Sequence, residues 1–172
     1  MALERGDCPA FWFPFKDRCY KYMASPMSWI EAEIFCLSQG TNLVSIHNQE
    51  EQEFVKSLIG NFDPTRSRTW IGLRDKDKEH FFMWTDGCPM QFDHWLRGEP
   101  NNHGGHEHCV DVNAIFEFQL QPSCSRFPPL HAVVIVKPYI STLDQFRCCC
   151  SNDLIKDNTE RSCYHHVELP IS

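Results

Sequence analysis

The sequence predicts an α+β domain in which two helices flank a mostly antiparallel sheet that carries long irregular loops. Two segments before residue 61 combine helix-capping residues with apolar residues at helical spacing. Shorter apolar segments, typical of strands, follow from residue 70. The stretch between Asp86 and His108 shows neither period, and loops longer than about 12–15 residues without secondary structure are usually functional or disordered.

Residues 8–23 are predicted to form a disulfide-closed hairpin. Aromatic and polar residues alternate here, with Pro9 and Pro14 as turn signals, and the segment ends in a strand over residues 19–23. The local spacing of Cys8 and Cys19 predicts that these two residues form a disulfide.

The first helix is predicted to begin after Ser28, because Ser28 and Glu31 form a capping-box signature. Gly40 can end this helix, and Cys36 falls on its apolar side, toward the core. A short strand is expected over residues 41–46.

The second helix is predicted to begin at Asn48, a favoured N-cap residue, and to present an apolar stripe before Gly60. From there the pattern changes to strands. They are expected over residues 70–73, 81–84 and 109–113.

Composition narrows the class of protein. The chain has 172 residues, and its 16 basic and 23 acidic residues give a net charge of −7 without a block of like charge, which argues against nucleic acid as a partner. Ten cysteines in a chain of this length favour a disulfide framework and an oxidising compartment. No apolar run is long enough for a membrane span or a leader. Because the cysteines indicate an oxidising compartment, we expect a secreted protein whose leader is missing from this sequence.

The loop over residues 99–109 is rich in oxygen ligands. Glu99, Asn101, Asn102 and Glu107 lie among glycines and one proline. Ca²⁺ takes about 6–8 oxygen ligands and tolerates irregular geometry, so this loop predicts a calcium site. The alternative is a solvated loop with accidental acidic residues.

This loop resembles the sugar-binding loop of the C-type lectin domain. The resemblance rests on Glu99-Pro100-Asn101, on a second Glu eight positions after the first, and on the His-Cys-Val that follows it. It is supported by a further set of residues: Trp70-Ile71-Gly72-Leu73, Trp84-Thr85-Asp86-Gly87, Trp95, Cys8, Cys19 and Cys36. The resemblance covers residues 8 to about 113, and the motifs are most similar to those of small secreted fish lectins and type II antifreeze proteins.

The resemblance implies that Glu99, Asn101 and Glu107 are both calcium ligands and sugar ligands, with a cis bond between Glu99 and Pro100. A sugar would place two vicinal hydroxyls on the Ca²⁺ while the carboxylates accept and the amide donates hydrogen bonds. In this family Glu-Pro-Asn goes with mannose-type sugars. Trp95 could offer a face to a sugar ring, but such a residue more often belongs to the core.

A weaker auxiliary calcium site is implied at Asp75, Glu79 and Asn102, where Asn102 replaces an acid of the family. The alternative is a plain polar loop. Zinc is a further possibility, since His103, His106, His108 and Cys109 have zinc-like chemistry, as does a set in the tail, but neither group has zinc-like spacing. The tail set comprises Cys148, Cys149, Cys150, Cys163, His165 and His166.

Family analogy also implies two further disulfides, one between Cys109 and Cys124 and one between Cys36 and a cysteine in the segment 148–150. Cys88 has no evident partner in the sequence, and the connectivity stays open.

Beyond Asn113 the resemblance stops. The family continues with a Trp-Asn-Asp strand whose Asn and Asp complete the calcium shell, whereas the matching positions here are Leu120 and Gln121. Either this last third is a read-through product of the gene or it is a divergent but genuine segment. We therefore assign a domain to residues 8–124 and a tail of uncertain structure to residues 125–172, and we expect weak binding of calcium and sugar.

The predicted function is that of a secreted, calcium-dependent lectin that binds carbohydrate or the glycans of glycoproteins. No nucleophile motif or phosphate loop indicates an enzyme. Two alternatives remain, an ice-binding type II antifreeze protein and a lectin-like domain without sugar binding.

Overall fold

The computed structural model describes residues 8–65, 67–75, 77–113, 119–123 and 131–138. It confirms an α+β architecture with two helices and a largely antiparallel sheet. The helices are α1 (Trp29–Ser38) and α2 (Gln49–Phe62), with a short 3-10 helix η1 (His103–Gly105). The strands are β1 (Phe13–Phe15), β2 (Arg18–Met27), β3 (Asn42–Leu43), β4 (Thr69–Arg74), β5 (Met83–Trp84), β6 (Cys109–Asn113), β7 (Gln119–Ser123) and β8 (His131–Pro138).

The strands form one sheet with the order β1-β2-β8-β4-β6-β7, while β3 pairs with β8 and β5 pairs with β4. The pairs are antiparallel except for β4 and β8, which run parallel. Strand β8 lies inside the sheet between β2 and β4. From the sequence, these residues are expected in a tail outside the domain. Their Val-Val-Ile-Val run has the β-branched composition that is enriched in strands.

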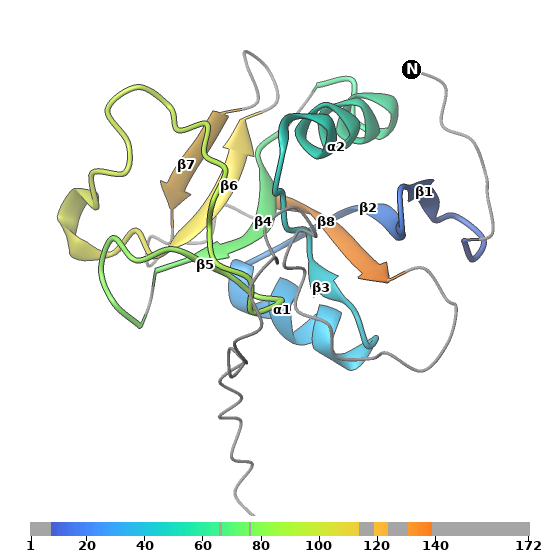
Figure 1. Ribbon diagram of the computed structural model, residues 1–172, viewed down its shortest axis with the longest axis horizontal. Helices are drawn as coiled ribbons and strands as arrows, with labels where there is room; N and C mark the ends of the chain where they lie inside the picture. Colours follow the sequence, from blue (N-terminus) through green and yellow to red (C-terminus); the bar gives the residue numbers. More distant parts are fainter. Residues whose placement is uncertain (1–7, 66, 76, 114–118, 124–130, 139–172) are drawn as a thin grey trace, which may run out of the picture.

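The two helices lie on opposite sides of the strands β3, β4 and β8 (Figure 1). Each helix covers its own apolar cluster. Val55, Leu58 and Ile59 of α2 pack in a cluster with Ile71 of β4, whereas Ala32 and Cys36 of α1 belong to a second cluster that contains Trp70. Successive residues of a strand point to opposite faces, which is why neighbours in β4 enter different cores.

Both helices begin at the predicted caps. The Ser28 hydroxyl accepts a hydrogen bond from the Glu31 backbone N–H, and the Glu31 carboxylate accepts from the Ser28 backbone N–H at 2.8 Å. Asn48 Oδ1 accepts from the Glu51 N–H at 3.0 Å and caps α2. Helix α2 runs through Gly60, its predicted end, to Phe62, whose ring packs against those of Phe13 and Tyr22.

Gly72 allows three segments to meet closely at β4. Its N–H donates to the Val44 carbonyl, and its carbonyl accepts from the Thr85 N–H. A Cβ on Gly72 would lie 2.7 Å from Thr85 Oγ1 and 2.9 Å from the Leu43 carbonyl oxygen, closer than side-chain carbons pack. A glycine here therefore holds β3 and the end of the β5 hairpin against β4.

The long connection between β5 and β6 contains η1 and projects away from both helices, at the left of Figure 1. This connection carries the predicted ligand residues. In the described part of the chain, no helix is long and apolar enough to cross a membrane.

Candidate functional site

The Glu99-Pro100-Asn101 segment brings one carboxylate and one amide together. The bond between Glu99 and Pro100 is cis, as the resemblance implies. Asn101 donates twice to Glu99, from its backbone N–H to Oε2 at 2.9 Å and from Nδ2 to Oε1 at 2.8 Å. An acceptor and a donor are thus held side by side at the surface of the loop.

Glu107 is tied to the same loop from its other end. Its Oε2 accepts from the His103 N–H at 2.8 Å, and its N–H donates to Asn102 Oδ1 at 3.0 Å. Asn102 has a left-handed backbone with φ 46°, a conformation that asparagine tolerates better than most residues. The turn η1 therefore reverses the chain and returns Glu107 toward the start of the loop.

The chemistry of this donor set fits a hard cation. Glu99, Asn101 and Glu107 offer carboxylate and amide oxygens, which calcium prefers, and the loop between them is irregular and exposed. Three such side chains fall short of the 6–8 oxygen ligands that Ca²⁺ takes, so water or a ligand would supply the rest.

The structure pairs Glu79 with Asn102 but gives Asp75 different partners. Asp75 is buried, and its carboxylate accepts from the His80 N–H at 2.8 Å and contacts His108 Nδ1 at 3.1 Å. Asn102 Nδ2 instead donates to the Glu79 carboxylate. Asp75 thus links the β4 end to the loop, which favours a structural role for this carboxylate.

By the resemblance, Leu120 and Gln121 stand where the family has its Asn and Asp ligands, and the Leu120 side chain has no atom that could bind calcium. Leu120 is 3% exposed and packs in the core with α2. Gln121 is half-buried in β7, opposite Asp111 of β6. Trp95 packs against this core and against Phe82, at 4.7 Å between ring centroids, so it belongs to the scaffold.

The cysteines follow the predictions in part. The disulfide between Cys8 and Cys19 is present. Cys36 is a buried free thiol, in contrast to the disulfide expected for it, and burial raises its pKa to about 12. The cysteines proposed as its partners lie outside the described residues. Cys109 is disulfide-bonded, and its partner lies outside the described residues. Cys124, the partner implied by family analogy, is among the residues that are not described.

The histidines of the loop do not gather into the zinc site considered above. His103 and His106 are exposed, whereas His108 contacts Asp75. The cysteines and histidines of the tail set lie outside the described residues.

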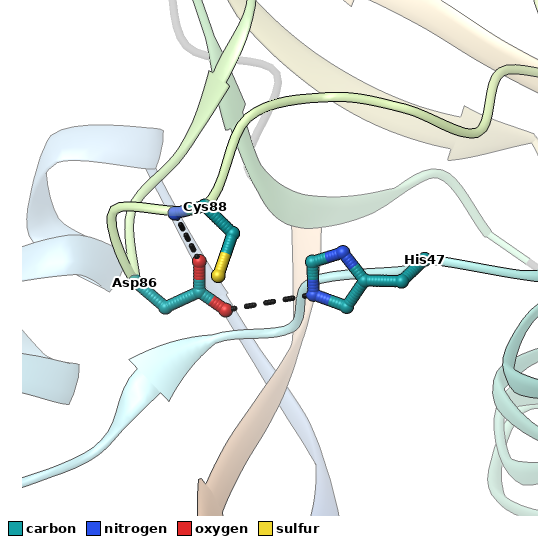
Figure 2. A group of neighbouring side chains, drawn as sticks. All are labelled: His47, Asp86 and Cys88. Carbon is teal, nitrogen blue, oxygen red and sulfur yellow. Dashed lines mark hydrogen bonds and ion pairs between the residues drawn. The ribbon is translucent and has the colours of Figure 1, made fainter. Parts of the chain in front are cut away.

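Sequence reasoning missed a cluster of His47, Asp86 and Cys88 beneath the start of the long loop. His47 precedes α2, while Asp86 and Cys88 follow β5 (Figure 2). Burial disfavours the Asp86 carboxylate, but the neighbouring His47, the Ser45 hydroxyl and the Cys88 N–H lower its pKa to about 2. Nothing local in the sequence joins residues 47 and 86, so only the paired strands reveal the cluster.

Residues 25–126 match the Lectin C-type domain family. The chain belongs to this family. The match includes both helices, the Glu99-Pro100-Asn101 loop and β7, and it confirms the resemblance that the loop motif indicated.

Named relatives agree with this assignment. The chain is 37% identical to ladderlectin of Oncorhynchus mykiss over 112 residues, which are 65% of this chain and 59% of that protein. It is 39% identical to the galactose-specific lectin nattectin of Thalassophryne nattereri over 108 residues, or 63% of this chain and 68% of that protein. A calcium-independent type II antifreeze protein of solved structure is 29% identical and superposes with a TM-score of 0.69, covering 81% of this chain and 98% of the other. This chain therefore spans less than two thirds of ladderlectin.

Proposed function

We propose that this protein is a secreted, calcium-dependent lectin that binds glycans through the loop over residues 99–107. The observation that supports the proposal most directly is the contact between Asn101 Nδ2 and Glu99 Oε1 at 2.8 Å. It presents a donor beside an acceptor, as recognition of two adjacent sugar hydroxyls requires.

Glu99, Asn101 and Glu107 would hold the calcium ion. When bound, the ion supplies a positive centre to which hydroxyl oxygens of a sugar can bind directly. The chain's own groups orient the sugar, because a carboxylate only accepts hydrogen bonds and an amide can donate them. We assign mannose-type sugars to this arrangement. One relative is a galactose-specific lectin by name, so the order of acid and amide in the triplet is the feature to test.

We expect weak binding. The family's remaining acid and amide ligands are replaced by Leu120 and Gln121, and calcium affinity depends strongly on the number of charged ligands. A calcium dissociation constant near the weak end of the range for extracellular calcium modules, about 1 mM, is the expected value.

The test is a glycan array probed with the wild type and with the double variant Glu99→Gln, Asn101→Asp, each with calcium and with a chelator. The variant exchanges acceptor and donor and should move binding from mannose-type toward galactose-type glycans. The matched control is Glu79→Gln, a loop carboxylate outside the triplet, which should keep the wild-type preference. An unchanged preference in a double variant that still binds calcium contradicts the proposal.

The antifreeze alternative has one observation in its favour, the structural likeness to a type II antifreeze protein. Thermal hysteresis separates the two functions. A lectin should produce none at concentrations that saturate a sugar column, whereas hysteresis without sugar retention would favour ice binding.

A further inference from the structure

Three side chains that the lectin site does not use converge on one point. An imidazole nitrogen of His47, a carboxylate oxygen of Asp86 and Cys88 Sγ all lie within 4.8 Å of one another. Figure 2 shows the imidazole of His47 directed at Asp86, with the Cys88 sulfur beside the same carboxylate. The three come from two segments that are far apart in the sequence, one before α2 and one after β5.

Hydrogen bonds hold the Asp86 carboxylate and the backbones of His47 and Cys88 in place before any ligand arrives. Asp86 Oδ1 accepts from the Cys88 N–H at 3.0 Å, and Asp86 Oδ2 accepts from Ser45 Oγ at 2.5 Å. The Ser45 hydroxyl in turn accepts from Arg18 Nη1 at 3.1 Å. The His47 backbone N–H donates to Glu51 Oε2 at 2.7 Å. Little conformational entropy would be lost on binding at such an ordered site.

The imidazole of His47 has no hydrogen bond at Nε2 within the described residues. This nitrogen is buried. The nearest Asp86 oxygen is 3.8 Å away, beyond hydrogen-bond distance. A buried polar atom without a hydrogen bond is unfavourable, so a ligand that engages Nε2 gains by satisfying it.

The geometry fits a zinc ion closely. Tetrahedral zinc with ordinary bond lengths to nitrogen, oxygen and sulfur places neighbouring ligand atoms about 3.4–3.6 Å apart. The separation of His47 Nε2 from Asp86 Oδ2 is 3.8 Å, and the largest separation in the cluster is below 4.8 Å. Small side-chain rotations would bring all three to binding distance.

The chemical types of the three ligands favour zinc over calcium. Thiolate and imidazole ligands suit zinc, whereas calcium prefers oxygen ligands throughout. A thiolate and a carboxylate together balance the double charge of the ion, and the side chains of His47 and Asp86 are only 17% and 13% exposed. A neutral complex is the form that tolerates such burial.

We propose that His47, Asp86 and Cys88 bind one zinc ion, with a fourth coordination position open to water. The ion would fasten the beginning of the long loop to the segment that enters α2. This site is separate from the oxygen ligands of Glu99, Asn101 and Glu107, and its role is structural.

The test uses the full, disulfide-bonded chain and titration with Co²⁺, whose thiolate complexes give a sulfur-to-metal charge-transfer band. The wild type should bind Co²⁺ with this band, and Zn²⁺ should displace it. Cys88→Ser should remove the band, and His47→Gln should weaken zinc binding at least about 100-fold, as expected for loss of one of three protein ligands.

The matched controls are Cys36→Ser, which removes a second buried cysteine of the described residues, and His106→Gln, which removes an exposed histidine of the loop. Both should retain the band and the wild-type zinc affinity. A band of unchanged intensity in Cys88→Ser, an equal loss in Cys36→Ser, or a wild type without the band would each overturn the proposal. His47→Gln keeps the thiol in place, so it tests the site even if Cys88→Ser folds poorly.

Discussion

Arg68 and Asp111 form a two-pronged ion pair between the start of β4 and the middle of β6. Arg68 Nε lies 2.9 Å from Asp111 Oδ1, and Nη2 lies 2.6 Å from Oδ2. The Asp111 carboxylate is fully buried, while the Arg68 side chain is 34% exposed. Both oxygens of Asp111 are engaged by the guanidinium, so this carboxylate is committed to the ion pair.

Replacing Arg68 with methionine should destabilise the domain by about 3–5 kcal/mol, because it removes the guanidinium that binds both oxygens of a fully buried carboxylate. Urea unfolding at neutral pH measures the change. Lys16→Met is the matched control, since Lys16 pairs with Glu50 at 2.7 Å but both side chains are largely exposed. An equal loss in the free energy of unfolding for the two substitutions would show that the buried pair stabilises the domain no more than the exposed pair does.

Calcium affinity should depend on Glu107 and not on Glu79. We expect Glu107→Gln to raise the calcium dissociation constant at least about tenfold, since the site has few charged ligands to lose. Glu79→Gln should leave it within about twofold, because the Glu79 carboxylate is hydrogen-bonded to Asn102 Nδ2 and lies outside the Glu99, Asn101 and Glu107 set. Isothermal titration with millimolar calcium measures both. If Glu79→Gln raised the calcium dissociation constant more than Glu107→Gln, the principal calcium site would be the auxiliary residues Asp75, Glu79 and Asn102.

Asp63 should make stability depend on acid pH. Partial burial disfavours its carboxylate, but hydrogen bonds from Thr65 and Ser67 lower its pKa to about 2. The folded pKa lies below the unfolded value, so this stabilisation is present above about pH 4 and is lost as the pH falls toward 2.

Asp63→Asn should therefore cost about 1 kcal/mol at pH 7, a value reduced for the group's exposure to solvent. The difference from wild type should vanish near pH 2. Urea unfolding across this pH range tests the prediction, and a constant difference at every pH would contradict it.

The disulfide between Cys8 and Cys19 should stabilise the hairpin that begins the sheet. These cysteines are 11 positions apart, and closing a loop of this size contributes about 2–3 kcal/mol in the chain-entropy account. The double variant Cys8→Ser, Cys19→Ser should lower the melting temperature, whereas Cys36→Ser in the same assay leaves every disulfide intact. Coincident melting curves of double variant and wild type would refute the contribution.

The helices and the loop could be predicted because their signals are local. Ser28 with Glu31 and Asn48 with Glu51 mark the starts of helices within four residues, and Glu99 with Asn101 marks the loop within three. Each of these features appears where the sequence placed it.

The features that were not predicted depend on pairing between distant segments. The apolar run at Val133 gives no sign of the strands that it joins, since β-pairing carries little information about the partner. His47 and Asp86 meet only because β3 and β5 both lie against β4. The free thiol of Cys36 likewise could not be read from cysteine number alone.

The place of β8 in the sheet sets an order of events during synthesis. Strand β2 pairs with β8 along nearly its whole length, although more than a hundred residues of chain lie between them. At about 5–20 residues per second, the ribosome delivers β8 on the order of ten seconds after β2 has emerged. Until then β2 and β4 present open edges that other nascent chains can join. The domain therefore closes late, and the interval before β8 arrives is when chaperones that shield strand edges matter most.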